Sequence, residues 1–583
     1  MAGTNQASIY PAFDRNFLNS DEDFSVIGGG ALGGKATGLA FVKRIIAQSL
    51  PPNIFSDVEV RIPRLAVVGT DVFEQFMEQN GLYEIALSDA PDARIAHVFQ
   101  KAELPPHIVG DLRALIVRAH QPLAVRSSSL LEDALQHPFA GTYGTKMIPN
   151  NQPAADARFQ RLVEAIKFVY ASTFFRDARS YMQAIGQAST TERMAVIIQE
   201  VVGQRFNERF YPTVSGVVRT HNSYARGHAR PEDGVTNLAL GLGKTIVDGG
   251  VTWSYCPKYP GQVPPFGSLG DLLKNTQTTF WAVNMGSPPP HDPISETEYL
   301  LEAGLDAAEY DDTLRRIAST YDPGSDRLRI GTGAPGPRVL TFAPLLELDD
   351  VPLNALILRL AEVCRAALDT DVEIEFAMSL DRRGATPAHR FGFLQLRPML
   401  VSAEQVAVAE ADLADPAALV ASERVLGNGV WEHMSDVVYV KPGAFEARRT
   451  SAIAAELASI NRALSTAGRP YVLIGFGRWG SSDQWLGIPV TWPQISAARA
   501  IVEAMLPQMN VEPSQGTHFF HNLTSFRVPY FTVRQGAPDR IDWGWLDRQP
   551  AVSETDHVRH VVAPGPLRCR VDGHAGRGVI LRP

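Results

Sequence analysis

Two glutamates separated by a single residue, Glu373 and Glu375, stand in the run VEIEFAM at residues 372–378. Apolar and polar side chains alternate along this run, which predicts a β-strand with both carboxylates on one face. A second alternating run, FGFLQL at residues 391–396, follows a segment rich in Arg, Gly and Pro. The pattern predicts an antiparallel hairpin.

The polar face of this hairpin combines acids with an amide and a guanidinium. On the second strand, Phe393, Gln395 and Arg397 are expected to share one face. Neighbouring carboxylates repel unless positive charge lies between them, and a divalent cation supplies it. Carboxylate oxygens suit Mg²⁺, which completes its ligand set with water and nucleotide phosphates. The alternative is a solvated acidic face on which Arg397 pairs with Glu373 or Glu375.

A glycine-rich loop lies near the start of the chain. Residues 24–27 form a short apolar run, GGGALGGK follows at 28–35, and residues 36–50 carry apolar side chains at helical spacing. The predicted order is strand, glycine loop and helix, with Lys35 at the helix start, where backbone N–H groups favour phosphate. G-x-G-x-x-G spacing also occurs, but the acidic residue of a dinucleotide site is not found in a following strand. The alternative is a surface lysine after a simple turn.

A second strand end carries an arginine among hydroxyl groups. Residues 123–125 predict a buried strand that ends at Arg126, and three serines follow. A guanidinium beside hydroxyl donors suits a polyphosphate, because its planar fork binds two oxygens at once. The alternative is an ion pair of Arg126 with Glu132 or Asp133. A second flexible lid with backbone donors is predicted from Gly141, Thr142, Gly144 and Thr145.

Residues 194–202, MAVIIQEVV, predict a buried strand interrupted by Gln199 and Glu200. A polar step near a strand end can supply partners to a purine edge, and an edge strand is the alternative. The later segment GLGKT is similar to a phosphate-binding P-loop. That assignment is rejected, because Leu238 replaces the first glycine that the motif requires.

The C-terminal part, residues 425–583, contains six of the eight tryptophans. Its apolar run YVLIGF at 471–476 predicts a buried strand, and a helix is expected over ISAARAIVEAML at 495–506. A candidate anion loop between them is formed by Gly477, Arg478, Gly480, Ser481 and Ser482. His518 and His521 have the chemistry to bind metal or carry a phosphoryl group, with a buried aromatic cluster as the alternative.

The composition is that of an ordinary globular protein. Of 583 residues, 20% are charged and 45% hydrophobic, and the length predicts about three to four compact units. The net charge of −9 provides no general attraction to nucleic acid or to an anionic membrane. Cys256, Cys364 and Cys569 form no paired motif, which fits a reducing compartment. Without a signal-like start or an apolar run of about 18 residues, we expect a cytoplasmic protein with no membrane partner.

Six motifs in one order connect these features: GGKATGL, AVRSSSLLED with FAGTYGT, IIQEVV, SGVVRT, GLGKTIVDGG and EIEFA with FGFLQLRP. Over about residues 20–402, the chain resembles the ATP-grasp nucleotide-binding domain of phosphoenolpyruvate synthase and pyruvate phosphate dikinase. That family also includes rifampicin phosphotransferases and glucan water dikinases. The resemblance implies an α/β (α+β) fold in which two subdomains clamp ATP, with an additional C-terminal α/β domain.

The resemblance also implies roles for individual residues. Lys35 and Arg126 would hold the ATP phosphates and act as the catalytic groups. Gly141 and Thr145 would belong to the loop that covers the phosphates. The adenine side would be formed by Gln199, Glu200 and Val202.

The same resemblance places the Mg²⁺ ligands on the predicted hairpin: Glu373, Glu375 and Gln395, with Arg397 alongside. Two positions depart from the family pattern. Lys244 stands where the GLGE motif has an acid, and Asn222 stands where an acid follows SGV-x-x-T. Both departures remove negative charge near the expected cleft.

The dikinases pass phosphate through a histidine on a mobile domain, marked by a TSHAA-type motif, and then to pyruvate in a TIM barrel. No such motif occurs here, and the 181 residues after position 402 are too few for that domain plus a barrel of about 250 residues. GRWGSSDQWLGIPV resembles the phosphohistidine motif in its LGIP ending, but Ser482 and Asp483 stand where histidine is required. We therefore expect the nucleotide-binding domain without these two domains.

The predicted organisation is an ATP-grasp N-terminal subdomain at 1–215, a second subdomain with the metal-binding hairpin at 216–402, a linker at 403–424 and a tryptophan-rich domain at 425–583. The predicted function is ATP- and Mg²⁺-dependent phosphoryl transfer, as a kinase acting on an unidentified acceptor. The alternative is a non-catalytic regulatory protein that senses ATP and alters its contact with a partner protein.

Overall fold

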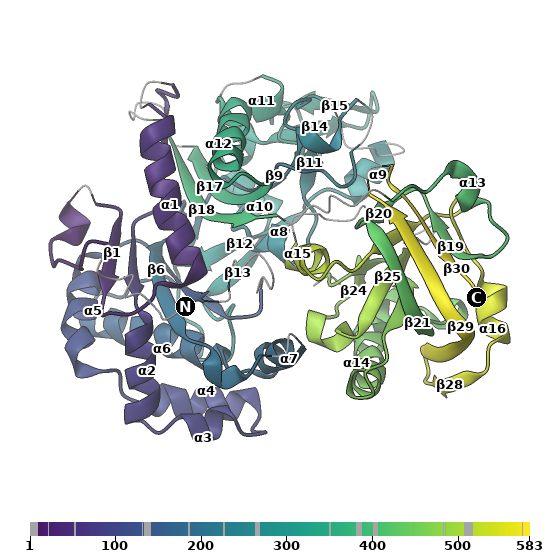
Figure 1. Ribbon diagram of the computed structural model, residues 1–583. Coiled ribbons are helices and arrows are strands. Elements are labelled where there is room, and N and C mark those ends of the chain that lie inside the picture. The colour runs from purple at the N-terminus through teal and green to yellow at the C-terminus, as the bar shows by residue number, and fades with distance from the viewer. Residues whose placement is uncertain are drawn as a thin grey trace. The chain divides into compact units, whose positions relative to one another are not determined.

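The computed structural model describes residues 10–583 apart from 21, 52–53, 131, 133–140, 185–186, 226–227, 263–268, 349–350, 381–387, 400–405, 482, 484, 506–516 and 574 (Figure 1). The chain forms two compact units. Unit 1 consists of Met1–Val218, Thr236–Thr245 and Thr252–Pro398, and unit 2 of Arg219–Val235, Ile246–Val251 and Met399–Pro583. The mixed α/β fold class with an additional C-terminal part is confirmed. Within the described residues, no helix is both long and apolar enough to cross a membrane.

A five-stranded sheet in unit 1 has the order β1-β3-β6-β4-β5. Its strands are β1 (Phe24–Ile27), β3 (Leu65–Val68), β6 (Met194–Glu200), β4 (Leu123–Ser129) and β5 (Thr145–Ile148). β1 and β3 are parallel, and the other pairs are antiparallel. Helix α1 (Gly33–Ser49) contacts β4, and α6 (Ala155–Ser172) contacts β4 and β5. The predicted order of strand, glycine loop and helix is therefore confirmed.

The turn into α1 depends on the absence of a side chain at Gly33. Its φ is 76°, and a Cβ atom there would lie 1.9 Å from the Ser128 carbonyl oxygen. Only glycine combines this left-handed conformation with so close an approach. The Ser128 hydroxyl donates to the Leu32 carbonyl at 2.8 Å and accepts from the Ala36 N–H at 3.1 Å. The start of the helix is thereby fixed against β4.

A second sheet of unit 1 contains the predicted hairpin and has the order β11-β10-β9-β17-β18-β2. Its strands are β11 (Trp253–Tyr255), β10 (Val235–Ala239), β9 (Val214–Arg219), β17 (Val372–Leu380), β18 (His389–Pro398) and β2 (Val58–Arg61). β17 and β18 are antiparallel, which confirms the hairpin. Helix α12 (Leu353–Leu368) contacts β17, and α1 contacts both α12 and β18.

The register of the hairpin shifts by one residue at Leu394. Glu375 pairs with Gln395, whereas the next residue, Phe376, pairs with Phe393. Paired residues point to the same face of a sheet, so Phe393 joins the apolar core and lies on the opposite face from Gln395. The prediction that Phe393 shares the polar face was wrong, because this β-bulge reverses the alternation.

Two smaller sheets complete unit 1. One has the order β13-β12-β8-β7, with β13 (Leu300–Gly304), β12 (Thr279–Asn284), β8 (Arg209–Tyr211) and β7 (Gln204–Phe206). The other has the order β15-β14-β16, with β15 (Arg327–Ile330), β14 (Ala318–Asp322) and β16 (Arg338–Leu340). Further helices before β17 are α2 (Thr70–Gln79), α3 (Tyr83–Ala86), α4 (Asp92–Lys101), α5 (Pro106–Arg118), α7 (Arg176–Ala184), α8 (Lys244–Val247), α9 (Leu269–Lys274), α10 (Leu305–Tyr310) and α11 (Ala343–Leu346).

Unit 2 is built on a ten-stranded sheet of order β20-β26-β25-β22-β21-β29-β30-β19-β27, with β28 paired to β29. Its strands are β19 (Ala418–Ser422), β20 (Val425–Leu426), β21 (Gly429–Val440), β22 (Tyr471–Phe476), β25 (Ala498–Ala504), β26 (Tyr530–Val533), β27 (Arg540–Ile541), β28 (Ala551–Glu554), β29 (Val558–Asp572) and β30 (Arg577–Leu581). β21, β22, β25 and β26 run parallel. A separate pair consists of β23 (Arg478–Trp479) and β24 (Gly487–Ile488). The helices are α13 (Glu410–Leu413), α14 (Thr450–Thr466), α15 (His518–Ser525) and α16 (Trp543–Arg548).

Two expectations for unit 2 differ from the structure. The segment 495–506, expected as a helix, contains strand β25, which lies between β22 and β26. A strand buried on both faces is a continuous apolar run, and such a run can imitate helical spacing. Residues 403–424, expected as a linker, contain α13 and contribute β19 to the large sheet.

Candidate functional site

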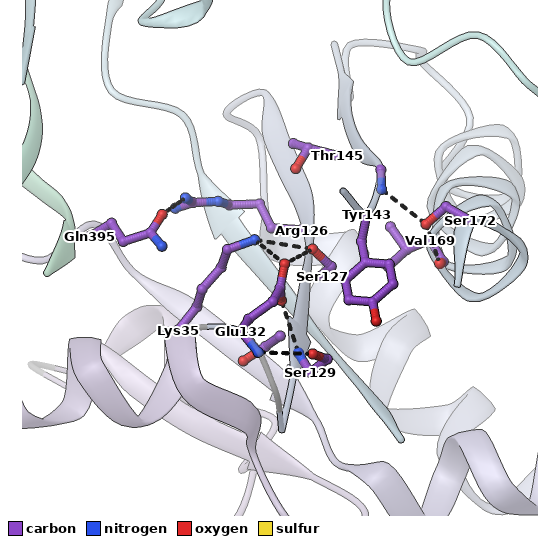
Figure 2. A network of polar contacts seen from close by, with 12 residues as sticks. Lys35, Arg126, Ser127, Ser129, Glu132, Tyr143, Thr145, Val169, Ser172 and Gln395 are labelled. Carbon is purple, nitrogen blue, oxygen red and sulfur yellow. Dashed lines mark hydrogen bonds and ion pairs between the residues drawn. The ribbon is translucent and has the colours of Figure 1, made fainter. Parts of the chain in front are cut away.

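Lys35 lies in the first turn of α1 and is 8% exposed. Its Nζ lies 2.6 Å from Glu132 Oε1 and 3.1 Å from Ser127 Oγ (Figure 2). The alternative of a surface lysine is therefore wrong. Glu132, considered as a partner of Arg126, pairs with Lys35. Asp133, the other acid considered there, lies outside the described residues.

The Glu132 carboxylate is 1% exposed, and among the described residues its partners come from α1 and β4. Besides Lys35, its Oε1 accepts from Ser127 Oγ at 2.9 Å and its Oε2 accepts from the Ser129 N–H at 2.9 Å. A buried ion pair is tolerated when such hydrogen bonds satisfy its remaining atoms. Lys35 is thereby held in one position beside the end of β4.

Arg126 lies in the middle of β4 and not at the strand end that was predicted, because the three serines continue the strand. Its guanidinium connects three strands of unit 1. Its Nη1 donates to Gln199 Oε1 on β6 at 3.2 Å and to the Leu394 carbonyl at 3.0 Å, and its Nη2 donates to Gln395 Oε1 at 2.9 Å. Leu394 is the bulge residue of β18, so the register shift presents its carbonyl oxygen to Arg126. Residues 126 and 395 are 269 positions apart, and Figure 2 shows their side chains meeting. The structure therefore brings the two predicted regions together.

Both predicted carboxylates of the hairpin pair with one arginine. Arg397 Nη1 lies 3.3 Å from Glu373 Oε1, and its Nη2 lies 3.4 Å from Glu375 Oε1. Glu373 and Arg397 are buried, whereas Glu375 is partly exposed. The ion pairs considered as the alternative to a metal site are thus present, although on a largely buried face.

The donor set of this face fits an Mg²⁺ bound together with a nucleotide. In the described part of the chain, no three His, Cys, Asp or Glu side chains are grouped for metal binding. Mg²⁺ does not require such a group, because it usually takes one or two carboxylates and completes its octahedron with water and substrate phosphates. Glu373 and Glu375 supply two carboxylates on one face, and Gln395 adds an amide oxygen that now accepts from Arg126.

The strand end predicted for the adenine lies next to this network. Gln199 joins it through Arg126. Val202 approaches β18 closely, since a Cβ built on Gly392 would lie 2.4 Å from Val202 Cγ2. Glu200 ends β6, and burial raises the pKa of its carboxyl, with Arg64 the leading opposing charge. Glu200 and Val202 therefore lie at the predicted strand end, and Gln199 contacts Arg126.

The predicted lid is described from Gly141 onward, and its earlier part at 133–140 lies outside the described residues. Gly141 has a φ of 65°, a left-handed conformation that suits glycine. The Thr145 N–H donates to Glu296 Oε1, and the Gly144 N–H donates to Ser172 Oγ, both at 2.9 Å. These bonds anchor the end of the lid to the loop before β13 and to α6.

A carboxyl near the lid was missed by the sequence analysis. Glu192 is buried and accepts from the Tyr143 hydroxyl at 2.8 Å. Burial, with a smaller contribution from the Glu132 charge, raises the pKa of Glu192 to about 7. An isolated acid before a strand carries no sequence signal for this, because the shift arises from tertiary burial.

The candidate anion loop of unit 2 surrounds a small cavity. Arg478, Gly480 and Ser481 line it, together with the buried Glu503 of β25 and Tyr530 of β26. The Tyr530 hydroxyl donates to Glu503, and burial raises the pKa of Glu503 to about 7. Ser482 lies outside the described residues, and Gly477 directly follows strand β22 with a φ of 71°. His518 and His521 both belong to α15, away from the predicted hairpin in sequence.

Comparison with known proteins finds a relationship in a segment that lies mostly in unit 1 and includes Arg219–Val235 and Ile246–Val251 of unit 2. Residues 30–259 match the family model described as pyruvate phosphate dikinase, AMP/ATP-binding domain. The phosphoenolpyruvate synthase of Aeropyrum pernix is 27% identical over 246 residues, which cover 38% of this chain and 26% of that protein. The rifampicin phosphotransferase of Streptomyces sviceus is 26% identical over 210 residues, which cover 33% of this chain and 22% of that protein.

The chain thus spans about a quarter of the length of these relatives. The matched segment contains Lys35, Arg126 and Gln199 and ends before the β17–β18 hairpin. Residues 30–259 are therefore similar to the AMP/ATP-binding domain of pyruvate phosphate dikinase and to phosphoenolpyruvate synthase.

Proposed function

We propose that this chain is an ATP- and Mg²⁺-dependent phosphotransferase with an ATP-grasp arrangement of unit 1. One observation carries the proposal: Arg126, in the matched AMP/ATP-binding segment, hydrogen-bonds Gln395 on the hairpin that bears both carboxylates. A cationic group, an amide and two carboxylates so arranged can surround a metal-bound triphosphate. The two relatives, a synthase and a phosphotransferase by name, support the same reaction class.

Lys35 and Arg126 are the groups proposed to hold the phosphates. Each is held by protein oxygens that a phosphate oxygen can replace: Glu132 and Ser127 for Lys35, and Gln199 and Gln395 for Arg126. Phosphoryl transfer needs mainly positioning and neutralisation of charge, so fixed cations supply much of the rate enhancement. Gly141 and Thr145 are proposed to cover the phosphates, and the strand end from Gln199 through Glu200 to Val202 to face the adenine.

Glu373, Glu375 and Gln395 are proposed as the protein ligands of Mg²⁺. Bound there, the ion would neutralise phosphate charge and orient the triphosphate. Glu375 is the more exposed of the two acids, and Arg397 is 3.4 Å from it, so its carboxylate is the easier one to turn toward a ligand. Arg397 would keep its contact with Glu373 and balance the remaining charge.

Replacement of Glu375 tests this proposal. Glu375→Gln keeps the side-chain shape but removes the charge, and we expect Mg²⁺-dependent ATP turnover to fall by more than about 100-fold. Glu362→Gln, on an exposed acid of α12, is the matched control and should leave turnover unchanged. Wild-type turnover in Glu375→Gln would remove Glu375 from the metal site.

A regulatory protein that senses ATP without chemistry is the second candidate. It is favoured by Arg397, which pairs with both Glu373 and Glu375. It is also favoured by Lys244 and Asn222, which stand where the family pattern has acids. Lys244 Nζ lies 5.8 Å from the Trp281 ring centroid, and Asn222 accepts from the Tyr224 N–H. Incubation with γ-labelled ATP separates the candidates, because label on an acceptor or on the protein requires transfer, whereas tight binding without turnover requires only sensing.

A further inference from the structure

An open cavity of about 400 Å³ lies in unit 1, beyond the start of β4. Its walls come from the residues before β4, the loop after β5, the start of α6, and the four-stranded sheet with the loop after β12. A volume of this size is typical of small-ligand sites. The lining residues that carry polar side chains are His120, Gln121, Asn150, Asn151, Gln152, Arg158 and Arg205.

The charge of this cavity differs from that of the whole chain. Among the described residues that line it are two arginines and a histidine and no carboxylate, although the chain has a net charge of −9. Within the described structure, neither Arg158 nor Arg205 forms an ion pair. Arg158 Nη1 donates to the Ala119 carbonyl at 2.7 Å, and Arg205 Nε donates to the Asn207 carbonyl at 3.1 Å. Two guanidinium groups without acids in one hollow attract an anion.

Hydrogen-bonding capacity in the walls also remains unused. Asn150 and Arg158 are 2% and 6% exposed, and Asn150 Oδ1, Gln152 Oε1 and Arg158 Nε are buried with no partner among the described residues. Buried polar atoms are normally satisfied by protein, water or ligand. The two amide oxygens require donors, such as the hydroxyl groups of a ligand. No side chain caps the start of α6, whose N-terminal N–H groups therefore add to the positive potential.

We propose that this cavity binds a small phosphorylated and hydroxylated metabolite at a site separate from the nucleotide. The oxyanion would lie between Arg158 and Arg205, and hydroxyl groups would donate toward Asn150 and Gln152. Pro122, in the wall, precedes Arg126 by four residues of extended chain, about 13 Å. Because the walls belong to two sheets of unit 1, the ligand would also stabilise their arrangement.

Calorimetric titration of the full chain tests this site, with saturating ADP present so that the nucleotide site is filled. The probes are inorganic phosphate, glycerol 3-phosphate and glycerate at constant ionic strength. We expect glycerol 3-phosphate to bind more tightly than inorganic phosphate, and Arg205→Gln to weaken it by about tenfold, as loss of a charged hydrogen bond does. Arg94→Gln, on an exposed residue of α4 with no lining role, is the control and should bind like the wild type.

Arg205 is exposed, so Arg205→Gln should fold normally, whereas Arg158→Gln also loses the bond to Ala119. Arg158→Lys therefore serves as the second variant, since it keeps the charge and loses the fork. No phosphate-ester binding by the wild type, or equal binding by Arg205→Gln and wild type, would overturn the proposal. Tighter binding of glycerate would also overturn it and assign the site to a carboxylate. If the chain does not bind ADP, the proposed function is contradicted. The titration with glycerol 3-phosphate still tests the cavity, because it measures binding at a different site.

Discussion

Glu132→Gln provides the most direct test of how Lys35 is held. Glu132 accepts from Lys35, Ser127 and Ser129, and glutamine has nearly the same shape but no charge. The substitution leaves a buried ammonium group, 8% exposed, without its counter-charge. We therefore expect the unpaired Lys35 to lower the free energy of unfolding of this region until another anion binds beside it.

The size of the effect follows from burial. Breaking a buried ion pair by removing one partner costs about 3–5 kcal/mol, a large share of the about 5–15 kcal/mol that stabilises a typical domain. Lys43, in the same helix as Lys35, pairs with Glu22 at 2.8 Å, but the side chains of Lys43 and Glu22 are 38% and 54% exposed. Glu22→Gln is therefore the matched control, with an expected cost below about 1 kcal/mol.

Hydrogen exchange at the amides of α1 and β4, measured by mass spectrometry, reports this local free energy. A local probe is needed because a chain of two units need not unfold in one step. ATP should restore more protection in Glu132→Gln than in wild type, since its phosphates replace the missing charge beside Lys35. Lys35→Met combined with Glu132→Gln should recover stability without responding to ATP.

Two outcomes would refute this reasoning. If Glu132→Gln and Glu22→Gln lower the local free energy of unfolding by the same amount, burial of the Lys35–Glu132 pair does not make its loss more destabilising. If the costs of Lys35→Met and Glu132→Gln simply add in the double variant, the two side chains are not energetically coupled despite their 2.6 Å separation.

Two further predictions concern pH and backbone geometry. Burial raises the pKa of Glu503 from 4.5 to about 7, so between these pH values the native state keeps a proton that the unfolded chain releases. The protonated Glu503 therefore contributes its full share to the free energy of unfolding below about pH 4.5. This share, about 3 kcal/mol, should be lost as the pH rises through 7. Glu503→Gln should remove this slope in hydrogen exchange at β25, and a persisting slope would assign it to other groups. Gly33→Ala should lower the melting temperature far more than Gly81→Ala. Both glycines have a positive φ, but a Cβ added at Gly33 would lie 1.9 Å from a backbone oxygen, whereas a Cβ added at Gly81 would meet no atom within 4 Å. Equal shifts in melting temperature would show that the Ser128 contact is not limiting.

The β17–β18 hairpin and the glycine loop before α1 were predictable because their signals are local. Alternation over 372–378 and 391–396 sets the faces of two neighbouring strands, and glycines before an apolar helix mark a turn. The bulge at Leu394 carries no such signal. It places Phe393 in the core and exposes a carbonyl to Arg126, and both results depend on packing between distant strands.

Strand β25 shows the opposite case, in which a local pattern led to the wrong element. The apolar spacing in 495–506 is compatible with a helix, and the neighbouring strands β22 and β26 decide that it is extended. The error also concealed Glu503, which would face solvent on an amphipathic helix but is buried beside Tyr530 in the sheet.

The sequence by itself determined the mixed α/β class, the hairpin with its two carboxylates, and the order of motifs shared with a nucleotide-binding family. Only the tertiary structure decided which polar side chains meet: Lys35 with Glu132, Arg126 with Gln395, and Arg397 with both glutamates. The reason is that residue type and periodicity specify which face a side chain occupies, whereas the partner across that face comes from chain segments up to 269 positions away. The pKa values of Glu192 and Glu503 follow the same rule, because burial by distant segments raises them.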